Sequence, residues 1–216
     1  MTSVFVQPPL FLRSLFAGSI WRIPTKEPII YLTFDDGPVP EATSYVLEIL
    51  KSFHIKATFF CIGKNVVKHP ELYQQIVAEG HHVGNHTFNH LNGWQTRTSN
   101  YILNIEQCQK VVHSTLFRPP YGKITLSQIK QVKRTMNIVM WDVLSYDFKA
   151  SVNPLQCADN VIRNCRPGSV VVFHDSIKAF NNMSVALPLV LEQLLAKGFR
   201  FEVIPQNLPP QSLFRP

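Results

Sequence analysis

The strongest constraint on the fold is an alternation of short apolar runs with longer amphipathic stretches along the chain. Short apolar runs are typical of buried strands, and apolar residues spaced by three and four are typical of helices. The predicted strands are residues 29–34, 57–62, 82–84, 116–117, 138–143, 169–173 and 199–204. The predicted helices are residues 41–53, 70–79, 99–114, 125–134, 154–164 and 185–196. This alternation predicts an α/β fold with a mainly parallel sheet, either a closed (β/α) barrel or an open doubly wound sheet.

The length of 216 residues fits a single domain. Residues 29–206 carry the alternating pattern and form the predicted domain. We expect residues 1–28 to be an N-terminal segment that packs on it through Phe, Leu and Trp21, and residues 207–216 to be a C-terminal tail. No apolar run approaches the roughly 20 residues that a membrane helix needs. Pro8 and Pro9 interrupt the first apolar stretch, which has no basic residue before it. We therefore expect no signal peptide and favour the cytoplasm, with the cell surface or periplasm left open.

Basic residues exceed acidic ones by 21 to 14, a formal net charge of +7. They are scattered, with no polybasic block and no zinc-finger spacing, so we expect no nucleic-acid partner. The four cysteines show no CxxC spacing, which favours a reducing compartment. Pairing of Cys157 with Cys165 stays open, as does the oligomeric state.

Polar side chains stand where most of the predicted strands end. In parallel α/β folds the carboxyl ends of the strands meet on one face, and that face carries the site. Five of the fourteen acidic residues lie at these ends, so chance placement is a poor explanation. The residues are Asp35, Asp36, His86, His90, Arg118, Asp142, Asp147, His174 and Asp175.

A metal site is indicated by the pair His86 and His90, whose spacing of four places both on one side of a helical turn. Two imidazoles and one carboxylate leave an open position, as in a catalytic zinc site. A second, adjacent carboxylate is a natural base for an attacking water, and His174 can donate a proton to a leaving group. The same ligand set also occurs in non-heme iron oxygenases, which stay as an alternative.

At this point the residues resemble the polysaccharide deacetylases with a NodB homology domain, carbohydrate esterase family 4. The resemblance runs from about residue 29 to residue 204, and it implies a distorted (β/α) barrel of about seven parallel strands. Five motifs carry it in order: TFDDGP at 33–38, HTFNH at 86–90, RPPYG at 118–122, YDF at 146–148 and VFHD at 172–175.

The resemblance implies a divalent metal held by Asp36, His86 and His90, most plausibly Zn²⁺, with Co²⁺, Mn²⁺ or Ni²⁺ as alternatives. Asp35 would take a proton from the attacking water, and Arg118 would hold Asp35 ionised and oriented.

The remaining implied roles concern the acyl group and the sugar. The backbone N–H of Tyr121 would help to stabilise the oxyanion. His174 would protonate the departing amine, and Asp147 would bind its imidazole and raise its pKa. Phe148 would form part of the sugar-binding wall. Asp142 follows Trp141 at a predicted strand end, and from that position we assign it a structural role or a supporting role behind the site residues.

The fourth motif departs from the family pattern Asp-x-x-Asp-Trp. Leu144 replaces the first Asp of this motif, and Phe148 replaces its Trp. The phenyl ring keeps a face for stacking but lacks the N–H donor of an indole. We expect a deacetylase of N-acetylated amino sugars, of the chitin-oligomer or peptidoglycan type. The alternatives are an amidase of a small cytoplasmic N-acetylated molecule and a catalytically silent sugar-binding protein.

Overall fold

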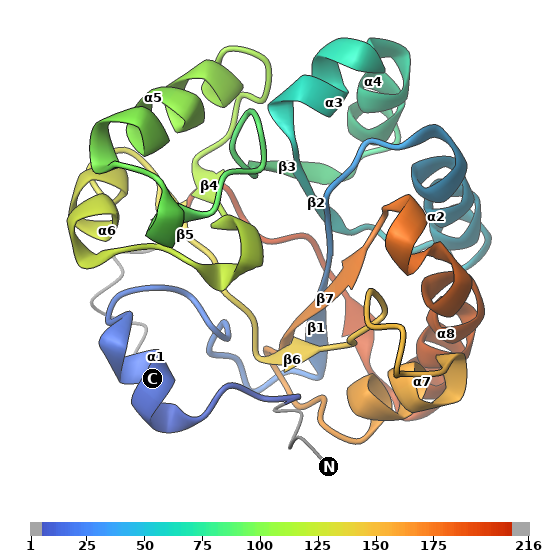
Figure 1. The fold of residues 1–216 in the computed structure, drawn as a ribbon. Coiled ribbons are helices and arrows are strands. Elements are labelled where there is room, and N and C mark those ends of the chain that lie inside the picture. Colours follow the sequence, from blue (N-terminus) through green and yellow to red (C-terminus); the bar gives the residue numbers. More distant parts are fainter. Residues whose placement is uncertain (1–5, 209–216) are drawn as a thin grey trace.

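The computed structural model describes residues 6–208 and shows one curled, all-parallel sheet with helices around its outside (Figure 1). The strand order is β5-β4-β3-β2-β1-β7-β6, and β8 pairs with the start of β1. The predicted distorted barrel of parallel strands is therefore confirmed. The strands are β1 Ile29–Asp35, β2 Thr58–Cys61, β3 His82–Asn85, β4 Leu116–Phe117, β5 Asn137–Ile138, β6 Val143–Leu144, β7 Val170–His174 and β8 Arg200–Phe201.

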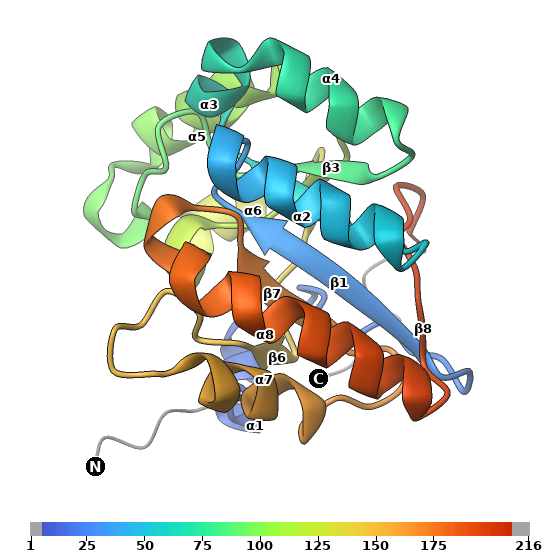
Figure 2. The ribbon, with the colours of Figure 1, turned by 90° about the vertical axis from the view of Figure 1, so that its right-hand side faces the viewer.

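The helices follow the strands in the order expected of β/α units. In Figure 2, α2 and α8 lie side by side along β1. The helices are α1 Leu10–Leu15, α2 Pro40–Ser52, α3 Gly63–Lys68, α4 Pro70–Ala78, α5 Thr98–Gln109, α6 Leu126–Val132, α7 Pro154–Ile162 and α8 Ile177–Ala196, with short 3₁₀ turns η1 Gly93–Gln95 and η2 Pro120–Gly122.

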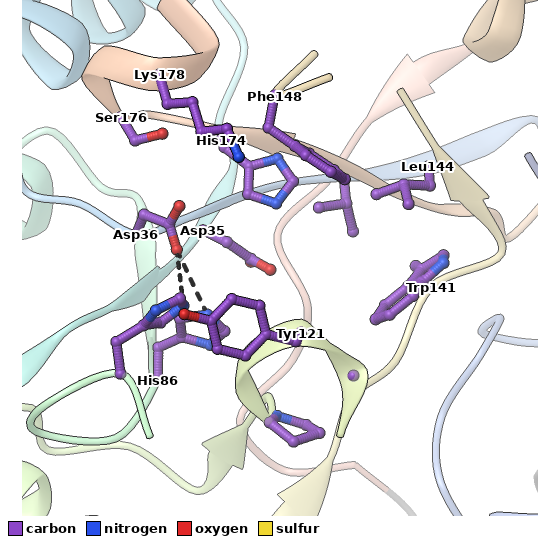
Figure 3. A pocket seen from close by; sticks show the side chains of 14 residues that line it. Asp35, Asp36, His86, Tyr121, Trp141, Leu144, Phe148, His174, Ser176 and Lys178 are labelled. Carbon is purple, nitrogen blue, oxygen red and sulfur yellow. Dashed lines mark ion pairs between the residues drawn. The ribbon is translucent and has the colours of Figure 1, made fainter. Parts of the chain in front are cut away.

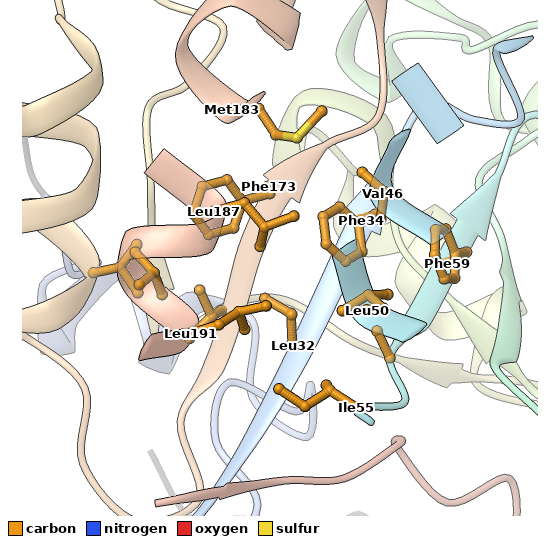
Figure 4. Close-up of a cluster of buried hydrophobic side chains, with 14 of the residues drawn as sticks. Leu32, Phe34, Val46, Leu50, Ile55, Phe59, Phe173, Met183, Leu187 and Leu191 are labelled. Atoms are coloured by element: carbon orange, nitrogen blue, oxygen red, sulfur yellow. The ribbon is translucent and has the colours of Figure 1, made fainter. Parts of the chain in front are cut away.

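The main core lies between the sheet and helices α2 and α8 (Figure 4). All seven residues of β1 are buried, which matches its uninterrupted apolar sequence. Phe34 stacks on Phe59 of β2 with ring centroids 5.1 Å apart, and Phe173 of β7 flanks it at 6.2 Å. This packing fixes β1 and β7, so the polar residues at their carboxyl ends have a rigid base.

The prediction of one strand over residues 138–143 is wrong, because the chain forms two short strands, β5 and β6, with a break between them. The N-terminal segment accounts for the break. Ile20 forms a parallel bridge with Val139, and the N–H of Met140 donates to the Ile20 carbonyl at 2.7 Å. A distant part of the chain thus takes the pairing that a continuous strand would have used.

Helix α8 begins at Ile177, eight residues before the predicted start, and continues through Pro188. Ala179 and Met183 are fully buried on its early turns, so packing onto the sheet stabilises a stretch whose own sequence gives a weak helical signal. Helices α1 and α3 were not predicted, and the helix predicted over 99–114 ends at Gln109.

The N-terminal segment packs on the sheet through the buried side chains of Ile20 and Trp21. Arg13 of α1 pairs with the fully buried Asp142 at 2.8 Å, and Asp142 also accepts hydrogen bonds from Arg166 and Ser169. Asp142 therefore ties α1 to the sheet. Residues 1–5 and 209–216 lie outside the described residues, so the start of the predicted segment and most of the predicted tail are not placed.

Among residues 6–208, none of the helices combines the length and the apolar character needed to cross a bilayer.

Candidate active site

A cavity of about 400 Å³ opens at the carboxyl ends of the strands, where the sequence placed the polar residues (Figure 3). Its volume is in the range of small-molecule sites. Charged groups lie on one part of the wall, and aromatic and aliphatic side chains form the rest. The lining residues are Asp35, Asp36, His86, His90, Pro119, Tyr121, Gly122, Trp141, Leu144, Phe148, Val172, His174, Ser176 and Lys178.

Asp36, His86 and His90 converge from two loops, and one ligand atom from each lies within 4.8 Å of the others. The Asp36 Oδ1 atom is 3.1 Å from Nε2 of His90 and 3.7 Å from Nε2 of His86. Burial opposes ionisation of Asp36, but the hydrogen bond with His90 and the nearby His174 outweigh it and lower the pKa of Asp36. The group is therefore a carboxylate flanked by two imidazole nitrogens.

The donor set fits a divalent cation of the zinc type. His86 Nδ1 lies 2.8 Å from the Arg118 carbonyl oxygen, which can only accept, so Nδ1 carries the proton and Nε2 keeps its lone pair toward Asp36. Such an outer hydrogen bond fixes the tautomer of a metal-binding histidine. Burial lowers the pKa of His86 to about 4, which keeps the ring neutral. Two nitrogens and one oxygen leave a further position open.

The expected helical turn between His86 and His90 is wrong, because this segment is an irregular loop after β3. Thr87 and His90 have φ of 61° and 56°, in the left-handed region. Asn85 accepts a hydrogen bond from the Thr87 N–H at 2.9 Å, and Asn104 of α5 accepts two from the next residues of the loop. The two rings face the same point because side-chain amides hold a strained loop.

Asp35 ends β1 beside the metal-site carboxylate and pairs with Arg118, whose Nη1 atom is 2.6 Å from Oδ1. Arg118 is fully buried, and its guanidinium also donates to Thr33 Oγ1 and to the carbonyls of Val139 and Met140. Burial lowers the pKa of Arg118 against the opposing pull of Asp35. The pKa of the arginine still lies far above neutral pH, so Arg118 stays protonated. A fixed positive charge therefore orients Asp35.

His174 ends β7, the strand next to β1, in register with Asp35, and is held by Asp147. The carboxylate of Asp147 accepts the backbone N–H of His174 at 2.6 Å and its Nδ1–H at 2.8 Å. Burial disfavours the charged imidazole, but the charge and hydrogen bond of Asp147 outweigh it and raise the pKa of His174 to about 9. Asn182 of α8 donates to the Asp147 carbonyl at 2.9 Å and steadies this loop. The arrangement presents a protonated Nε2–H to the cavity.

Two aromatic residues predicted for the site also line the cavity. Tyr121 lies in η2 with φ of 60°, and its ring is 4.6 Å from that of His90. Phe148 meets His174 edge-on at 4.9 Å. Every site residue predicted from the sequence therefore lies in the cavity wall or holds a residue that does.

The sequence did not indicate Trp141 or Lys178 as part of the wall. Trp141 was read as the end of a buried strand, but it lies in the break between β5 and β6 and packs against Gly122, where an added Cβ would lie 2.4 Å from its ring. Lys178 follows the VFHD motif by three residues, and only that proximity could have pointed to it. Leu144, at the position of the family's first Asp, contributes an apolar side chain to the wall.

Asp175 was noted at a strand end, and the structure places it behind the cavity, where it clamps the turn after β1. Its carboxylate accepts the Gly37 N–H at 3.0 Å and the Thr43 hydroxyl at 2.6 Å, and its own N–H donates to the Asp35 carbonyl at 3.0 Å. A Cβ on Gly37 would lie 1.9 Å from Asp175 Oδ2. The glycine of TFDDGP is thus required by close approach of this carboxylate.

Comparison with known proteins points to the same family as the five sequence motifs. The sequence profile "Polysaccharide deacetylase" matches residues 22–141. A peptidoglycan-N-acetylglucosamine deacetylase of Bacillus cereus is 35% identical over 87% of this chain and 92% of its own length. A chitooligosaccharide deacetylase of Azorhizobium caulinodans is 30% identical over 87% of this chain and 98% of its own.

Among solved structures, a peptidoglycan N-acetylglucosamine deacetylase in complex with 4-naphthalen-1-yl-N-oxidanyl-benzamide superposes with a TM-score of 0.81 at 33% identity. The match covers 91% of this chain and 95% of that one. The resemblance drawn from the five motifs is confirmed, and the chain belongs to the polysaccharide deacetylase family of hydrolases, carbohydrate esterase family 4.

Proposed function

We propose that this protein removes acetyl groups from N-acetylated amino sugars in glycans of the chitin-oligomer or peptidoglycan type, and that it needs a divalent metal. One observation carries the proposal. The Asp36, His86 and His90 cluster lines the same cavity as Asp35 and His174, so a metal site, a base and an acid meet at one point. Relatives named for deacetylation of such glycans support the substrate class.

Asp36, His86 and His90 would hold the metal, with zinc preferred from the mixed nitrogen and oxygen donors. A metal bound there supplies a Lewis acid for the acyl oxygen and acidifies water. Asp35 lies next to Asp36 and takes the proton of the attacking water as general base. Arg118 keeps Asp35 aimed at the cavity, because it bonds one carboxylate oxygen and leaves the other toward the opening.

Attack of water on the acetamide carbon places negative charge on the acyl oxygen. The backbone N–H of Tyr121 would donate a hydrogen bond to this oxygen and stabilise the charge. Collapse of this species breaks the C–N bond. His174 gives its Nε2 proton to the departing nitrogen, while Asp147 stabilises the charged imidazole through Nδ1. The products are acetate and a free amine on the sugar, and Phe148 offers a face against which the ring can pack.

Two alternatives from the sequence have less support. A silent sugar-binding protein predicts a missing base or metal ligand, whereas Asp35, Asp36 and both histidines are in place. An iron oxygenase needs no proton donor beside the metal site, yet His174 lies in the same cavity with a carboxylate partner that favours its protonated form. A small N-acetylated molecule uses the same groups and differs only in size, so substrate length decides between it and a glycan.

The test is acetate release after metal removal. The protein is stripped with a chelator, and Zn²⁺, Co²⁺, Mn²⁺ or Ni²⁺ is restored singly. Acetate is then measured with N-acetylglucosamine, its oligomers and peptidoglycan fragments, with the Asp35→Asn protein as control. We expect activity on oligomers that is lost with the metal and regained with zinc. Activity confined to the monomer would favour the small-molecule alternative, and metal-independent release would contradict the proposal.

A further inference from the structure

The cavity has an apolar lobe, which we define by the side chains of Trp141, Leu144 and Val172. In Figure 3, Trp141 and Leu144 lie on the opposite side of the cavity from Asp36 and His86. None of the three side chains of the lobe can donate or accept a proton in the proposed reaction. The lobe is therefore open to a role in binding the substrate.

The register of three neighbouring strands places the lobe below the reacting groups. Asp35 of β1 pairs with His174 of β7, and two residues earlier Thr33 pairs with Val172. Leu144 of β6 is the partner of Val172 on its other side. Side chains two residues apart on a strand face the same way, and partners in register share that face. Val172 and Leu144 therefore face the cavity side of the sheet as His174 does, roughly 6.5 Å deeper along the strands.

Elsewhere in this layer the interior of the curled sheet is filled. Arg118 is fully buried and donates to Thr33 Oγ1, and its guanidinium carbon lies 4.0 Å from the centroid of the Phe60 ring. Leu144 and Val172 border the cavity instead. Leu144 stands where the family pattern has an Asp, so a hydrocarbon side chain takes the place of a charged one. The deep part of the cavity on the β6 and β7 side is thus suited to an apolar group.

The shape of a glycan substrate decides which of its groups enters the lobe. The sugar belongs to a chain, so it must extend out through the mouth of the cavity. In the proposed mechanism its nitrogen lies beside His174, and the acyl oxygen lies toward the candidate metal site. The carbon chain of the acyl group is the remaining substituent of the reacting carbon, so it points inward, toward Leu144 and Val172. An acetyl methyl extends inward by a single bond, whereas these side chains lie a whole layer deeper.

We infer that the apolar lobe is an acyl subsite, and that the enzyme also removes straight N-acyl groups of three or four carbons from amino sugars. This wider substrate class rests on the proposed deacetylase function. The reaction balances as it does for acetyl. Water adds to the acyl carbon, the C–N bond breaks, His174 gives its proton to the nitrogen, and propionate or butyrate leaves beside the free amine. Leu144 and Val172 are then specificity-determining residues, because they contact the added methylenes.

The experiment compares three glucosamine oligomers of equal length on the metal-loaded enzyme, one N-acetylated, one N-propionylated and one N-butyrylated. The free amine is measured, so all three substrates give the same signal. We expect kcat/KM for the butyryl oligomer to be at least as high as for the acetyl oligomer, because the added methylenes are buried in the lobe. A lower kcat/KM for butyryl than for acetyl would overturn the acyl subsite and leave the deacetylase function intact. No release from any of the three would overturn the function itself.

Variants of the lobe test the same inference through the ratio of the butyryl to the acetyl kcat/KM. Leu144→Phe fills the lobe and should lower this ratio by about 15-fold, the worth of two buried methylenes. Val172→Ile adds one methyl group to the lobe and should lower the ratio in the same direction, so the result does not depend on the folding of Leu144→Phe.

Leu103→Phe on α5 is the matched control, since this leucine is exposed and does not line the cavity, and it should leave the ratio unchanged. A merely structural role of the lobe would lower kcat/KM for both substrates equally. A ratio that neither Leu144→Phe nor Val172→Ile lowers would therefore overturn the acyl subsite.

Discussion

The guanidinium of Arg118 lies 2.6 Å from Oδ1 of Asp35, and both side chains are buried inside the curled sheet. Three further acceptors hold Arg118, so it cannot turn away from this carboxylate. Asp35 Oδ2 accepts no hydrogen bond from a side chain or backbone group within residues 6–208, and the Asp35 side chain lines the cavity. The guanidinium thus fixes one oxygen of the carboxylate and leaves the other free, which suits the role of base proposed for Asp35.

Asp35→Asn is expected to lower kcat by at least about 100-fold, because the amide cannot accept the proton of water. Metal affinity should stay near that of the wild type, since Asp36, His86 and His90 are untouched. Acetate release and bound metal per protein measure the two effects. Asp36→Asn is the matched control and should lose metal as well as activity. Near-normal turnover of Asp35→Asn would remove Asp35 from the role of base.

Arg118→Met is expected to lower the free energy of unfolding by roughly 3–5 kcal/mol, the cost of leaving one member of a buried pair alone. Chemical denaturation of the wild type, Arg118→Met, Asp35→Asn and the double variant forms a double-mutant cycle. We expect the double variant to be clearly less destabilised than the sum of the single changes. Simple additivity would show that the two charges do not act as a pair.

The sheet was predictable because its strands are uninterrupted apolar runs, as in residues 29–34 and 169–173. The break between β5 and β6 was not predictable, because nothing in the local sequence distinguishes Met140 from its neighbours. Met140 leaves the sheet because its N–H donates to the carbonyl of Ile20, 120 residues earlier in the chain. Long-range pairing of this kind overrides a local pattern. Helix α8 is the converse case, in which burial of Met183 stabilises a helix across a stretch of weak propensity.

The site was predictable where it depends on strand ends. Asp35, His174 and Arg118 meet because parallel strands place their carboxyl ends on one face. The aromatic and cationic wall was not predictable, because it depends on where side chains point. Trp141 turns into the cavity only because the strand breaks before it, and Lys178 reaches inward from the first turn of α8.

The pKa of His174 predicts the pH dependence of stability. Its folded value of about 9 lies above the ordinary 6.5, so protonation stabilises the fold. That contribution is fully present below about pH 6.5 and is lost as the pH rises through about 9. Asp147→Asn should remove the largest stabilising partner and lower the pKa of His174. NMR titration of the metal-free protein, with exposed His113 as an internal reference, measures the change. An unchanged value would contradict the role of Asp147.

The pH dependence of kcat should also depend on the protonation of His174. If His174 protonates the leaving amine, kcat falls on the alkaline side as this imidazole loses its proton. A dication bound beside Asp36 disfavours the charged ring, so the alkaline limb of the loaded enzyme should lie below pH 9. Asp147→Asn should move that limb further toward acid. If the alkaline limb of the kcat profile does not move in Asp147→Asn, a group other than His174 is responsible for it.

Metal binding tests the His86 assignment separately from catalysis. His86→Ala should lose bound zinc and activity together, whereas His174→Ala should keep its zinc and lose turnover. His113→Ala, an exposed histidine outside the cavity, is the matched control and should keep both. Elemental analysis after dialysis against trace zinc gives the metal content. Zinc retained in His86→Ala, or lost in His174→Ala, would reassign the ligands.

Gly37→Ala tests whether the hydrogen bonds of Asp175 hold the turn that carries Asp35 and Asp36. An added Cβ would lie 1.9 Å from Asp175 Oδ2, so the carboxylate must leave Gly37 and Thr43 or the turn must shift. We expect the free energy of unfolding to fall by roughly 1–3 kcal/mol, the usual cost of overpacking. Because the same turn carries Asp35 and Asp36, zinc affinity should fall with it. Gly198→Ala has open space around its Cβ and only a positive φ to oppose it, so it should cost less stability and leave zinc affinity unchanged. Equal behaviour of the two variants would show that Asp175 does not position the turn.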